Sequence, residues 1–192
     1  MIVIDGLAWQ SSAKVPPIIG QTWLKLVEQW VTDGKAQDFA ILVRGEEMPP
    51  LPKDAFFSYI PAYKYEEAEE DRFGLQSACD QLDAKLFVST HYTVALKTPS
   101  IAAVYDLQAE KLERNDLVAQ EKKLSILTSV ACLCFSDWVL RDLKSYYPGI
   151  PSDMTRVVYP GIHSDLRMIS PLPLKKFRQE HGLERPYVIF RA

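Results

Sequence analysis

Short apolar runs alternate with segments of helical periodicity along almost the whole chain, and this alternation restricts the fold more than any other feature. The apolar runs are Met1–Ile4, Phe39–Val43, Ala55–Ile60, Leu86–Ser89, Ile101–Val104, Cys132–Phe135 and Arg156–Tyr159. Apolar residues at consecutive positions are typical of strands that are buried on both faces of a parallel sheet. The sequence therefore predicts an α/β fold, in which helices cover both faces of a parallel sheet.

Four segments between these runs place apolar residues at the 3.6-residue spacing of a helix. They begin near Trp23, with the acidic cluster Glu66–Asp71, at about Asp116 and at Trp138, the last with Ser136 as N-cap. The expected inward-facing residues of the third helix are Leu117, Leu124, Leu127 and Ala131, and those of the fourth are Val139, Leu143 and Tyr146. The loop Arg44–Lys53 contains Pro49, Pro50 and Pro52, which exclude regular structure there.

Composition excludes several classes of protein. The net charge of −3 argues against nucleic-acid binding, which requires a basic surface. The apolar runs are far shorter than the roughly 20 residues of a membrane span, and Asp5 interrupts the only apolar stretch that could form a secretory signal. We therefore expect a cytoplasmic protein. Its three cysteines are too few and wrongly spaced for a zinc site, so we expect reduced core thiols and no bound metal.

Polar side chains follow several of the predicted strands, where an open parallel sheet binds its ligands. Arg44, His91, Tyr105 and Asp106 all stand at or just after strand ends. His91 would either bind a hydroxyl or phosphate of a ligand or order its own loop. Asp106 would either cap backbone N–H groups or orient a hydroxyl of a substrate. Topology alone should bring these groups to one edge.

The first strand-to-helix connection, Gly6–Gly20, argues against a dinucleotide-binding enzyme. It contains no G-x-G-x-x-G, and Pro16 and Pro17 remove two backbone donors that could contact phosphate. Gly20 is the one glycine close to the predicted helix. It would either lie near a phosphate or simply open the helix.

Several segments, taken in order, resemble the N-terminal domain of family 4 glycosyltransferases. They are MIVIDGLAWQ, IIGQTWLKLVEQW, FVSTHYT (Phe87–Thr93), VYDLQAE (Val104–Glu110), EKKLSILTSVACLCFSDWVLRDLKSYYP (Glu121–Pro148) and VVYPGIHSDL (Val157–Leu166). The final RPYVIF (Arg185–Phe190) is similar to the first strand of that family's C-terminal domain.

This resemblance implies a Rossmann-like domain that forms the N-terminal half of a GT-B architecture. It implies a retaining glycosyltransferase that uses a nucleotide-sugar as co-substrate, needs no bound metal, and transfers the sugar to a glycan or lipid-linked acceptor in polysaccharide or glycolipid synthesis. By position, Asp106 and His91 would act on the acceptor hydroxyl, and Tyr105, Glu110 and Arg44 would contact the acceptor. Gly20 would lie near the donor phosphates. The acidic residues that act on the donor would lie beyond Ala192, so this chain alone should be inactive.

Two positions depart from the family pattern. Ile18 stands where the family often has a first glycine, and Tyr105 stands where many members have histidine. These departures keep a second hypothesis open, a non-catalytic Rossmann-like module that binds a partner or regulates an assembly. A nucleotide-sugar epimerase shares the two-domain plan, but its catalytic carboxylates and histidine do not map well onto this sequence.

The tail differs from the rest of the chain. We expect residues 1–170 to form the acceptor-binding domain, and 171–192 to contain a linker helix (Leu174–His181) and the first strand of a missing C-terminal donor-binding domain. Lys175, Lys176 and Arg178 form a small basic face on that helix. This face would fit either peripheral contact with the inner membrane face or a plain solvated helix surface.

Overall fold

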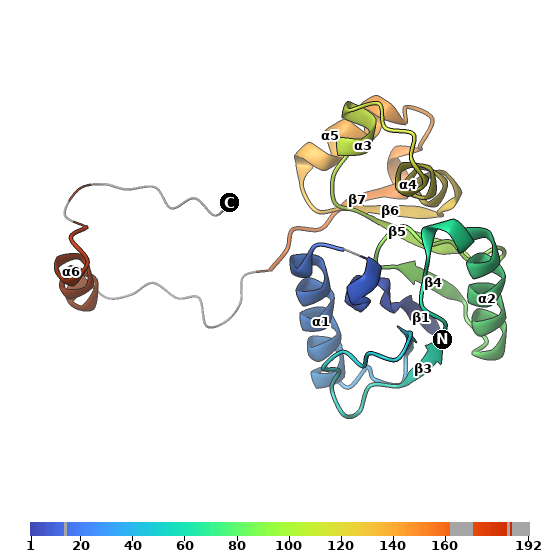
Figure 1. Cartoon of the computed structure of the whole chain (residues 1–192), viewed down its shortest axis with the longest axis horizontal. Helices are drawn as coiled ribbons and strands as arrows, with labels where there is room; N and C mark the ends of the chain where they lie inside the picture. Colours follow the sequence, from blue (N-terminus) through green and yellow to red (C-terminus); the bar gives the residue numbers. More distant parts are fainter. Residues whose placement is uncertain (14, 162–170, 184, 186–192) are drawn as a thin grey trace. The chain divides into compact units, whose positions relative to one another are not determined.

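A computed structural model describes residues 1–13, 15–161, 171–183 and 185. The chain divides into two compact units, Met1–Pro160 and Gly161–Ala192. The first unit is built on a seven-stranded sheet in the order β3-β2-β1-β4-β5-β6-β7, and every pair of neighbouring strands is parallel (Figure 1). The strands are β1 (Ile2–Asp5), β2 (Phe39–Arg44), β3 (Phe57–Ile60), β4 (Leu86–Ser89), β5 (Ser100–Val104), β6 (Ala131–Cys134) and β7 (Thr155–Val157).

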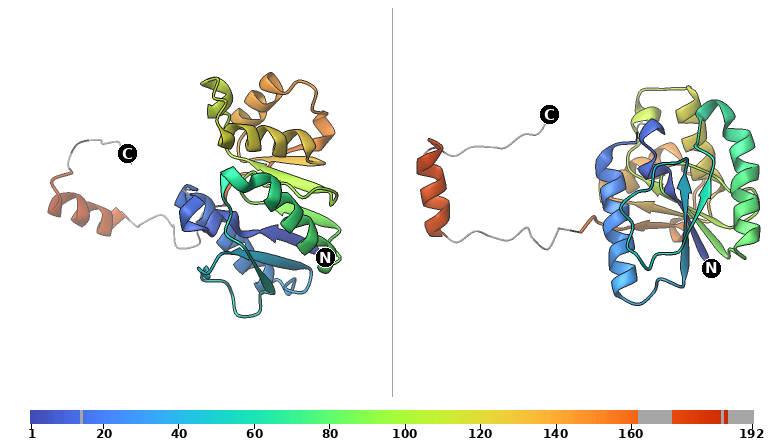
Figure 2. Two further views of the ribbon diagram at one scale, coloured as in Figure 1. Left: turned by 45° about the vertical axis from the view of Figure 1, so that its right-hand side comes forward. Right: turned by 60° about the horizontal axis from the view of Figure 1, so that its bottom comes forward.

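Helices cover both faces of this sheet, as the sequence predicts. They are α1 (Pro17–Thr32), α2 (Ala68–Gln81), α3 (Gln108–Lys111), α4 (Leu117–Thr128) and α5 (Asp137–Tyr146), while the second unit contains α6 (Pro171–Glu180). Figure 2 shows α1 on one side of the sheet and α2 on the other. Because side chains alternate along a strand, Ile4 packs with Trp23 of α1 whereas its neighbour Val3 packs with Leu75 of α2.

A third apolar cluster holds α4 and α5 against β5 and β6. Ile126 and Leu143 pack there with Ala102, Val104 and both cysteines of β6. All three cysteines are free and buried, which confirms the prediction of reduced core thiols. Burial raises the pKa of each thiol, so none is a reactive thiolate at neutral pH.

Three helix starts show how local chemistry sets the helix boundaries. Helix α1 begins at Pro17, six residues before the predicted start, because proline at the first helical position needs no N–H partner and already has a helical φ. Ser136 caps α5 as predicted, since its hydroxyl accepts a hydrogen bond from the Val139 N–H (3.2 Å). Asp116 caps α4 in the same way, through the Ala119 N–H.

The predicted inner face of α4 is wrong. Leu117 and Leu127 are exposed and Ala131 already belongs to β6, whereas Lys122 and Ile126 are buried. Apolar residues occur all around this helix, so their spacing does not select one face. On α5, Leu143 is buried as predicted, but Tyr146 is exposed and the next residue, Tyr147, takes the inner place.

The helix predicted at Leu174–His181 is present as α6, three residues earlier at its start. The strand predicted at Pro186–Phe190 lies outside the described residues, as do residues 162–170. The domain boundary predicted between residues 170 and 171 therefore stays a prediction. None of the helices in the described ranges is both long and apolar enough to cross a bilayer.

Candidate functional site

The loops that follow β4 and β5 bring His91, Tyr105 and Asp106 to the carboxyl-terminal edge of the sheet. The rings of His91 and Tyr105 are stacked, with centroids 6.4 Å apart and planes 24° apart. Asp106 follows Tyr105, and its carboxylate acts electrostatically on His91. The structure thus gathers three of the predicted site residues at one place.

The loop that carries His91 is held rigidly by hydrogen bonds on both sides of the histidine. Thr90 donates its hydroxyl to the Asp5 carbonyl (2.7 Å) and accepts from the Ala8 N–H (3.0 Å). Thr93 donates its hydroxyl to the Asp5 carboxylate (2.5 Å), and its N–H donates to Ser89 (2.7 Å). Strand β1 therefore fixes where His91 stands.

His91 is a mostly buried imidazole with unused hydrogen-bonding capacity. Its Nδ1 is buried and has no hydrogen-bond partner in the described structure. Burial lowers the pKa of His91 to about 4, although the carboxylate of Asp106 opposes this shift. At neutral pH the ring is therefore uncharged, and it can exchange a hydrogen bond with a hydroxyl group but cannot act as a cation.

Asp106 is a carboxylate at this edge that remains open to solvent. Its side chain is 56% exposed, and one oxygen accepts from the Gln108 N–H (2.9 Å). The same oxygen lies 3.5 Å from the ammonium of Lys122. The Gln108 bond shows that Asp106 does cap a backbone N–H, but the carboxylate retains acceptor sites that a ligand hydroxyl can use.

Tyr105 has no free hydroxyl. Its oxygen donates to the Thr90 carbonyl (2.7 Å) and accepts from the indole N–H of Trp23 (2.6 Å). Burial raises the pKa of this phenol further above neutrality. The ring stacks on Phe135 at 4.8 Å. Tyr105 can therefore offer a ligand only its ring, not a hydrogen bond.

Glu110 is also committed to the protein. Its carboxylate accepts from Lys122 (2.8 Å) and from the Tyr147 hydroxyl (2.8 Å), and only 11% of the side chain is exposed. The side chain of Lys122 is 4% exposed, and its ammonium lies 5.6 Å from the Tyr92 ring centroid. Sequence reasoning missed Lys122, since a lysine among apolar helix residues ordinarily reaches solvent. We assign Glu110 a structural role, that of neutralising this lysine.

Arg44 does not reach the predicted acceptor side of the edge. Its guanidinium donates to Asp5 (2.5 and 3.0 Å) and to Asp71 (2.6 and 3.1 Å), and the side chains of Arg44 and Asp5 are fully buried. Burial alone lowers the pKa of Arg44, but the two carboxylates outweigh it and raise the pKa. Four of the five N–H groups of the guanidinium bond to carboxylates and the side chain is fully buried, so the structure gives Arg44 an interior role away from an acceptor.

Gly20 lies in the first turn of α1 and packs against the loop after β1. A Cβ there would come within 2.7 Å of the Ala8 carbonyl oxygen, and the Gly20 carbonyl accepts from the indole N–H of Trp9 (2.8 Å). Pro16 and Pro17 have no N–H, and the Ile19 N–H already bonds to Pro16. Close packing thus explains this glycine, and the helix start offers few donors to a phosphate.

No group of three metal-ligating side chains occurs in the part of the chain that the structure describes. Neither protein-family models nor curated protein sequences give a match to this chain. Solved structures do match the chain. The chain aligns with WaaG, a glycosyltransferase involved in lipopolysaccharide biosynthesis, over 96% of its own length with a TM-score of 0.63 and 12% identity. The chain has the fold of a GT-B glycosyltransferase domain.

A second GT-B structure, HepE of Anabaena in complex with UDP and glucose, aligns over 95% of the chain with a TM-score of 0.56 and 12% identity. The chain spans about half of each neighbour, 52% of WaaG and 50% of HepE. The predicted Rossmann-like, GT-B-type fold is thereby confirmed. At this identity the likeness establishes the fold, and the chemistry has to be argued from the site.

Proposed function

We propose that this chain is the acceptor-binding domain of a retaining glycosyltransferase, which transfers a sugar from a nucleotide-sugar to a glycan or glycolipid acceptor. The observation that carries the proposal is the pair His91 and Asp106. Asp106 keeps open acceptor sites at the ligand edge of the sheet, and His91 beside it is an uncharged ring whose buried Nδ1 bonds to no protein group, while Arg44, Glu110 and the Tyr105 hydroxyl are bonded within the protein. The GT-B fold supports the proposal, because WaaG is a glycosyltransferase and HepE forms a complex with UDP and glucose.

In this proposal the two groups orient one hydroxyl of the acceptor. The Asp106 carboxylate accepts a hydrogen bond from this hydroxyl, and the neutral imidazole of His91 forms a second hydrogen bond with the same sugar. Holding the nucleophile near the anomeric carbon recovers part of the roughly 7–11 kcal/mol that proximity and orientation can contribute to catalysis. The donor is a co-substrate held by a second domain, no metal cofactor takes part, and this chain alone is inactive.

The transfer assay that tests the proposal uses the full gene product. The purified protein is incubated with UDP-, GDP- and ADP-sugars and a glycan acceptor library, and transfer is detected by mass spectrometry. We expect transfer from one donor, and Asp106→Ala should lower its rate at least tenfold while the melting temperature stays unchanged. Asp80→Ala, which removes a carboxylate from α2, serves as the matched control. Unchanged turnover in Asp106→Ala would remove Asp106 from the site.

One observation favours a different function. The first turn of α1 lacks the glycine-rich, donor-rich surface that contacts phosphate in many nucleotide-binding folds. A non-catalytic module that binds a partner would not need that surface. Reading the gene past residue 192 separates the two: a second α/β domain with two spaced acidic residues supports the transferase, and an unrelated domain supports the module.

The cellular location belongs to the same proposal. We infer that the enzyme acts on the cytoplasmic side, where nucleotide-sugars are made, and meets lipid-linked acceptors at the membrane surface. In the second unit, Lys176 pairs with Glu180 at 3.7 Å, so the basic face of α6 is partly neutralised. Flotation of the full gene product with anionic vesicles tests the membrane contact, which should weaken as salt is raised.

A further inference from the structure

Two large aromatic side chains stand exposed at the ends of β6 and β7. Trp138, the second residue of α5, is 71% exposed, and Tyr159, two residues after β7, is 63% exposed. The other three tryptophans, Trp9, Trp23 and Trp30, pack with the apolar core between α1 and the sheet. Trp138 and Tyr159 belong to none of the apolar clusters of the described residues, and exposed apolar side chains that gather on a surface are typical of binding sites.

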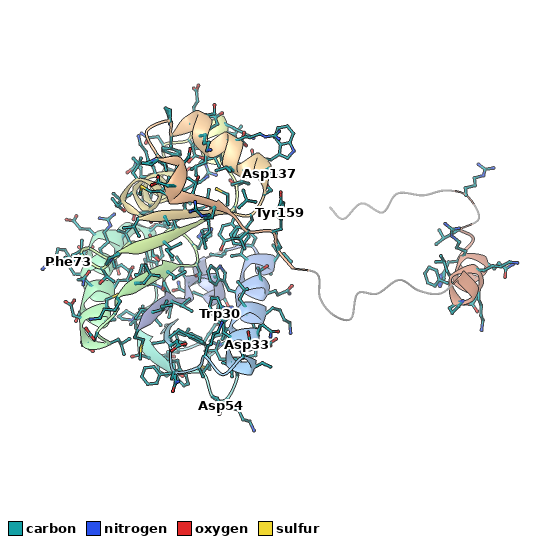
Figure 3. All side chains as sticks on the ribbon, turned by 180° about the vertical axis from the view of Figure 1, so that it is seen from behind. Trp30, Asp33, Asp54, Phe73, Asp137 and Tyr159 are labelled. Atoms are coloured by element: carbon teal, nitrogen blue, oxygen red, sulfur yellow. The ribbon has the colours of Figure 1, made fainter. Side chains whose placement is uncertain are left out.

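Charged groups connect these two aromatic residues. The Tyr159 hydroxyl donates to the carboxylate of Asp137, which Figure 3 shows beside it. The Arg141 guanidinium lies 5.2 Å from the centroid of the Trp138 ring, and its charge also acts on the Tyr159 phenol. Asp137, Trp138, Arg141 and Tyr159 thus form one cluster, which we call the α5 aromatic cluster.

The α5 aromatic cluster lies at the same edge as His91 and Asp106. Strand β6 is the direct neighbour of β5, and β7 follows it. Neighbouring strands are about 4.8 Å apart, which places the ends of β6 and β7 about 5 and 10 Å along the edge from the end of β5. The stacked rings of Tyr105 and Phe135 bridge the ends of β5 and β6. An extended ligand that touches Asp106 can therefore continue along this edge to the cluster.

We infer that the α5 aromatic cluster is a subsite for a second sugar ring of the acceptor, so that the acceptor is an oligosaccharide rather than a single sugar or a small alcohol. This inference rests on the proposed function. A pyranose has an apolar C–H face, which stacks on an indole, and a rim of hydroxyl groups. The exposed indole of Trp138 can contact the apolar face, while Asp137 accepts hydrogen bonds from hydroxyls and Arg141 donates to them.

The charges around the cluster favour a glycan over a lipid surface. A membrane-binding surface combines aromatic residues with several cations. Here Arg141 is flanked on α5 by Asp137 and by Asp142, which pairs with Lys111, and Lys144 follows in the last turn of the helix. The carboxylate of Asp137 at the centre of the cluster would repel anionic lipid headgroups, whereas it is the usual partner of a sugar hydroxyl.

A glycan array tests the subsite directly on this chain. The biotinylated chain is clustered on streptavidin, because multivalent display makes weak binding measurable, and is applied to an array of bacterial and plant-type oligosaccharides. We expect a defined set of glycans to bind, and Trp138→Ala to weaken that binding at least tenfold. Trp138→Phe should retain part of it. Phe73→Ala removes a similarly exposed aromatic ring from α2, on the far side of the unit in Figure 3, and should bind like the wild type.

Three outcomes overturn the inference: no glycan bound by the wild-type chain, equal binding by Trp138→Ala, or equal loss in Phe73→Ala. A further control adds vesicles of phosphatidylcholine and phosphatidylglycerol, and Trp138-dependent vesicle binding without glycan binding also overturns it in favour of a lipid surface. The proposed function fails separately. If Trp138-dependent glycan binding holds but the full gene product transfers no sugar, the subsite stands and the transferase does not.

Discussion

Replacing Arg44 by methionine should destabilise the fold strongly, because this guanidinium sits between two carboxylates inside the protein. Four hydrogen bonds of 2.5–3.1 Å join Arg44 to Asp5 and Asp71. Methionine fills a similar volume but leaves Asp5 fully buried and Asp71 mostly buried, without a counter-charge. Removing one partner of a buried ion pair costs about 3–5 kcal/mol, a large share of the roughly 5–15 kcal/mol that holds a domain together.

Urea unfolding followed by far-UV circular dichroism measures this loss. For an m-value of about 2 kcal/mol/M, a loss of about 4 kcal/mol moves the midpoint down by about 2 M. Lys25→Met is the matched control, since Lys25 forms an exposed ion pair with Glu28 on α1, and such pairs contribute less than about 1 kcal/mol. A loss below 1 kcal/mol for Arg44→Met would refute the buried network and return Arg44 to the candidate acceptor ligands.

Two further measurements separate the loss of charge pairing from poor packing. Burial raises the pKa of Asp71 even with Arg44 present, and without the guanidinium this pKa should rise further. The folded variant then binds protons more readily than the unfolded chain, so the deficit of Arg44→Met should shrink as the pH falls from 7 to 5. The triple variant Arg44→Met, Asp5→Asn, Asp71→Asn should recover more than half of the lost stability, whereas a purely steric defect would persist.

Three smaller changes test other parts of the structure, each by the same urea assay. Gly20→Ala should lower the free energy of unfolding by about 1–3 kcal/mol, because its Cβ would lie 2.7 Å from the Ala8 carbonyl oxygen. Gly74→Ala on α2, where a Cβ meets open space, should raise the free energy of unfolding by about 0.5–1 kcal/mol. Equal effects of the two changes would contradict the packing described for α1. Ser136→Ala should cost about 1 kcal/mol through loss of the α5 N-cap, and no loss would show that the cap is dispensable. NMR titration of His91 should give a pKa near 4. The imidazole of the unfolded chain takes up its proton first, near pH 6.5, so wild-type stability should fall relative to that of His91→Gln by about 3 kcal/mol between pH 6.5 and 4. Parallel curves of stability against pH for the two proteins would contradict the burial of His91.

The sheet could be predicted from the sequence because its strands are continuous apolar runs. Leu86–Ser89 is found with the predicted boundaries, and the other strands differ by a few residues at their ends. A parallel arrangement then puts every strand end at one edge, which is why His91 and Asp106 could be placed together without any motif. The GT-B resemblance extends this to the order of the elements.

The division of polar residues between the interior and the ligand edge could not be predicted. Arg44 ends an apolar strand and His91 follows one, but the partners of Arg44 are Asp5 and Asp71, 39 and 27 residues away, and no local pattern reports those contacts. Lys122 is buried only because Glu110, on the short helix α3, lies within 2.8 Å of it. The buried face of α4 depends on this ion pair, so the spacing of apolar residues alone predicts the wrong buried face.

The position of the bound acceptor tests the central claim most directly. The ¹⁵N-labelled chain is titrated with the glycan that the transfer assay identifies as acceptor, and amide shifts are mapped by NMR. Binding at the carboxyl-terminal edge should shift the amides of residues 90–93, 105–108 and 135–138. The opposite edge carries a separate cleft lined by Met1, Asp38 and Lys85, and shifts confined to that cleft would contradict the assignment of this edge to the acceptor.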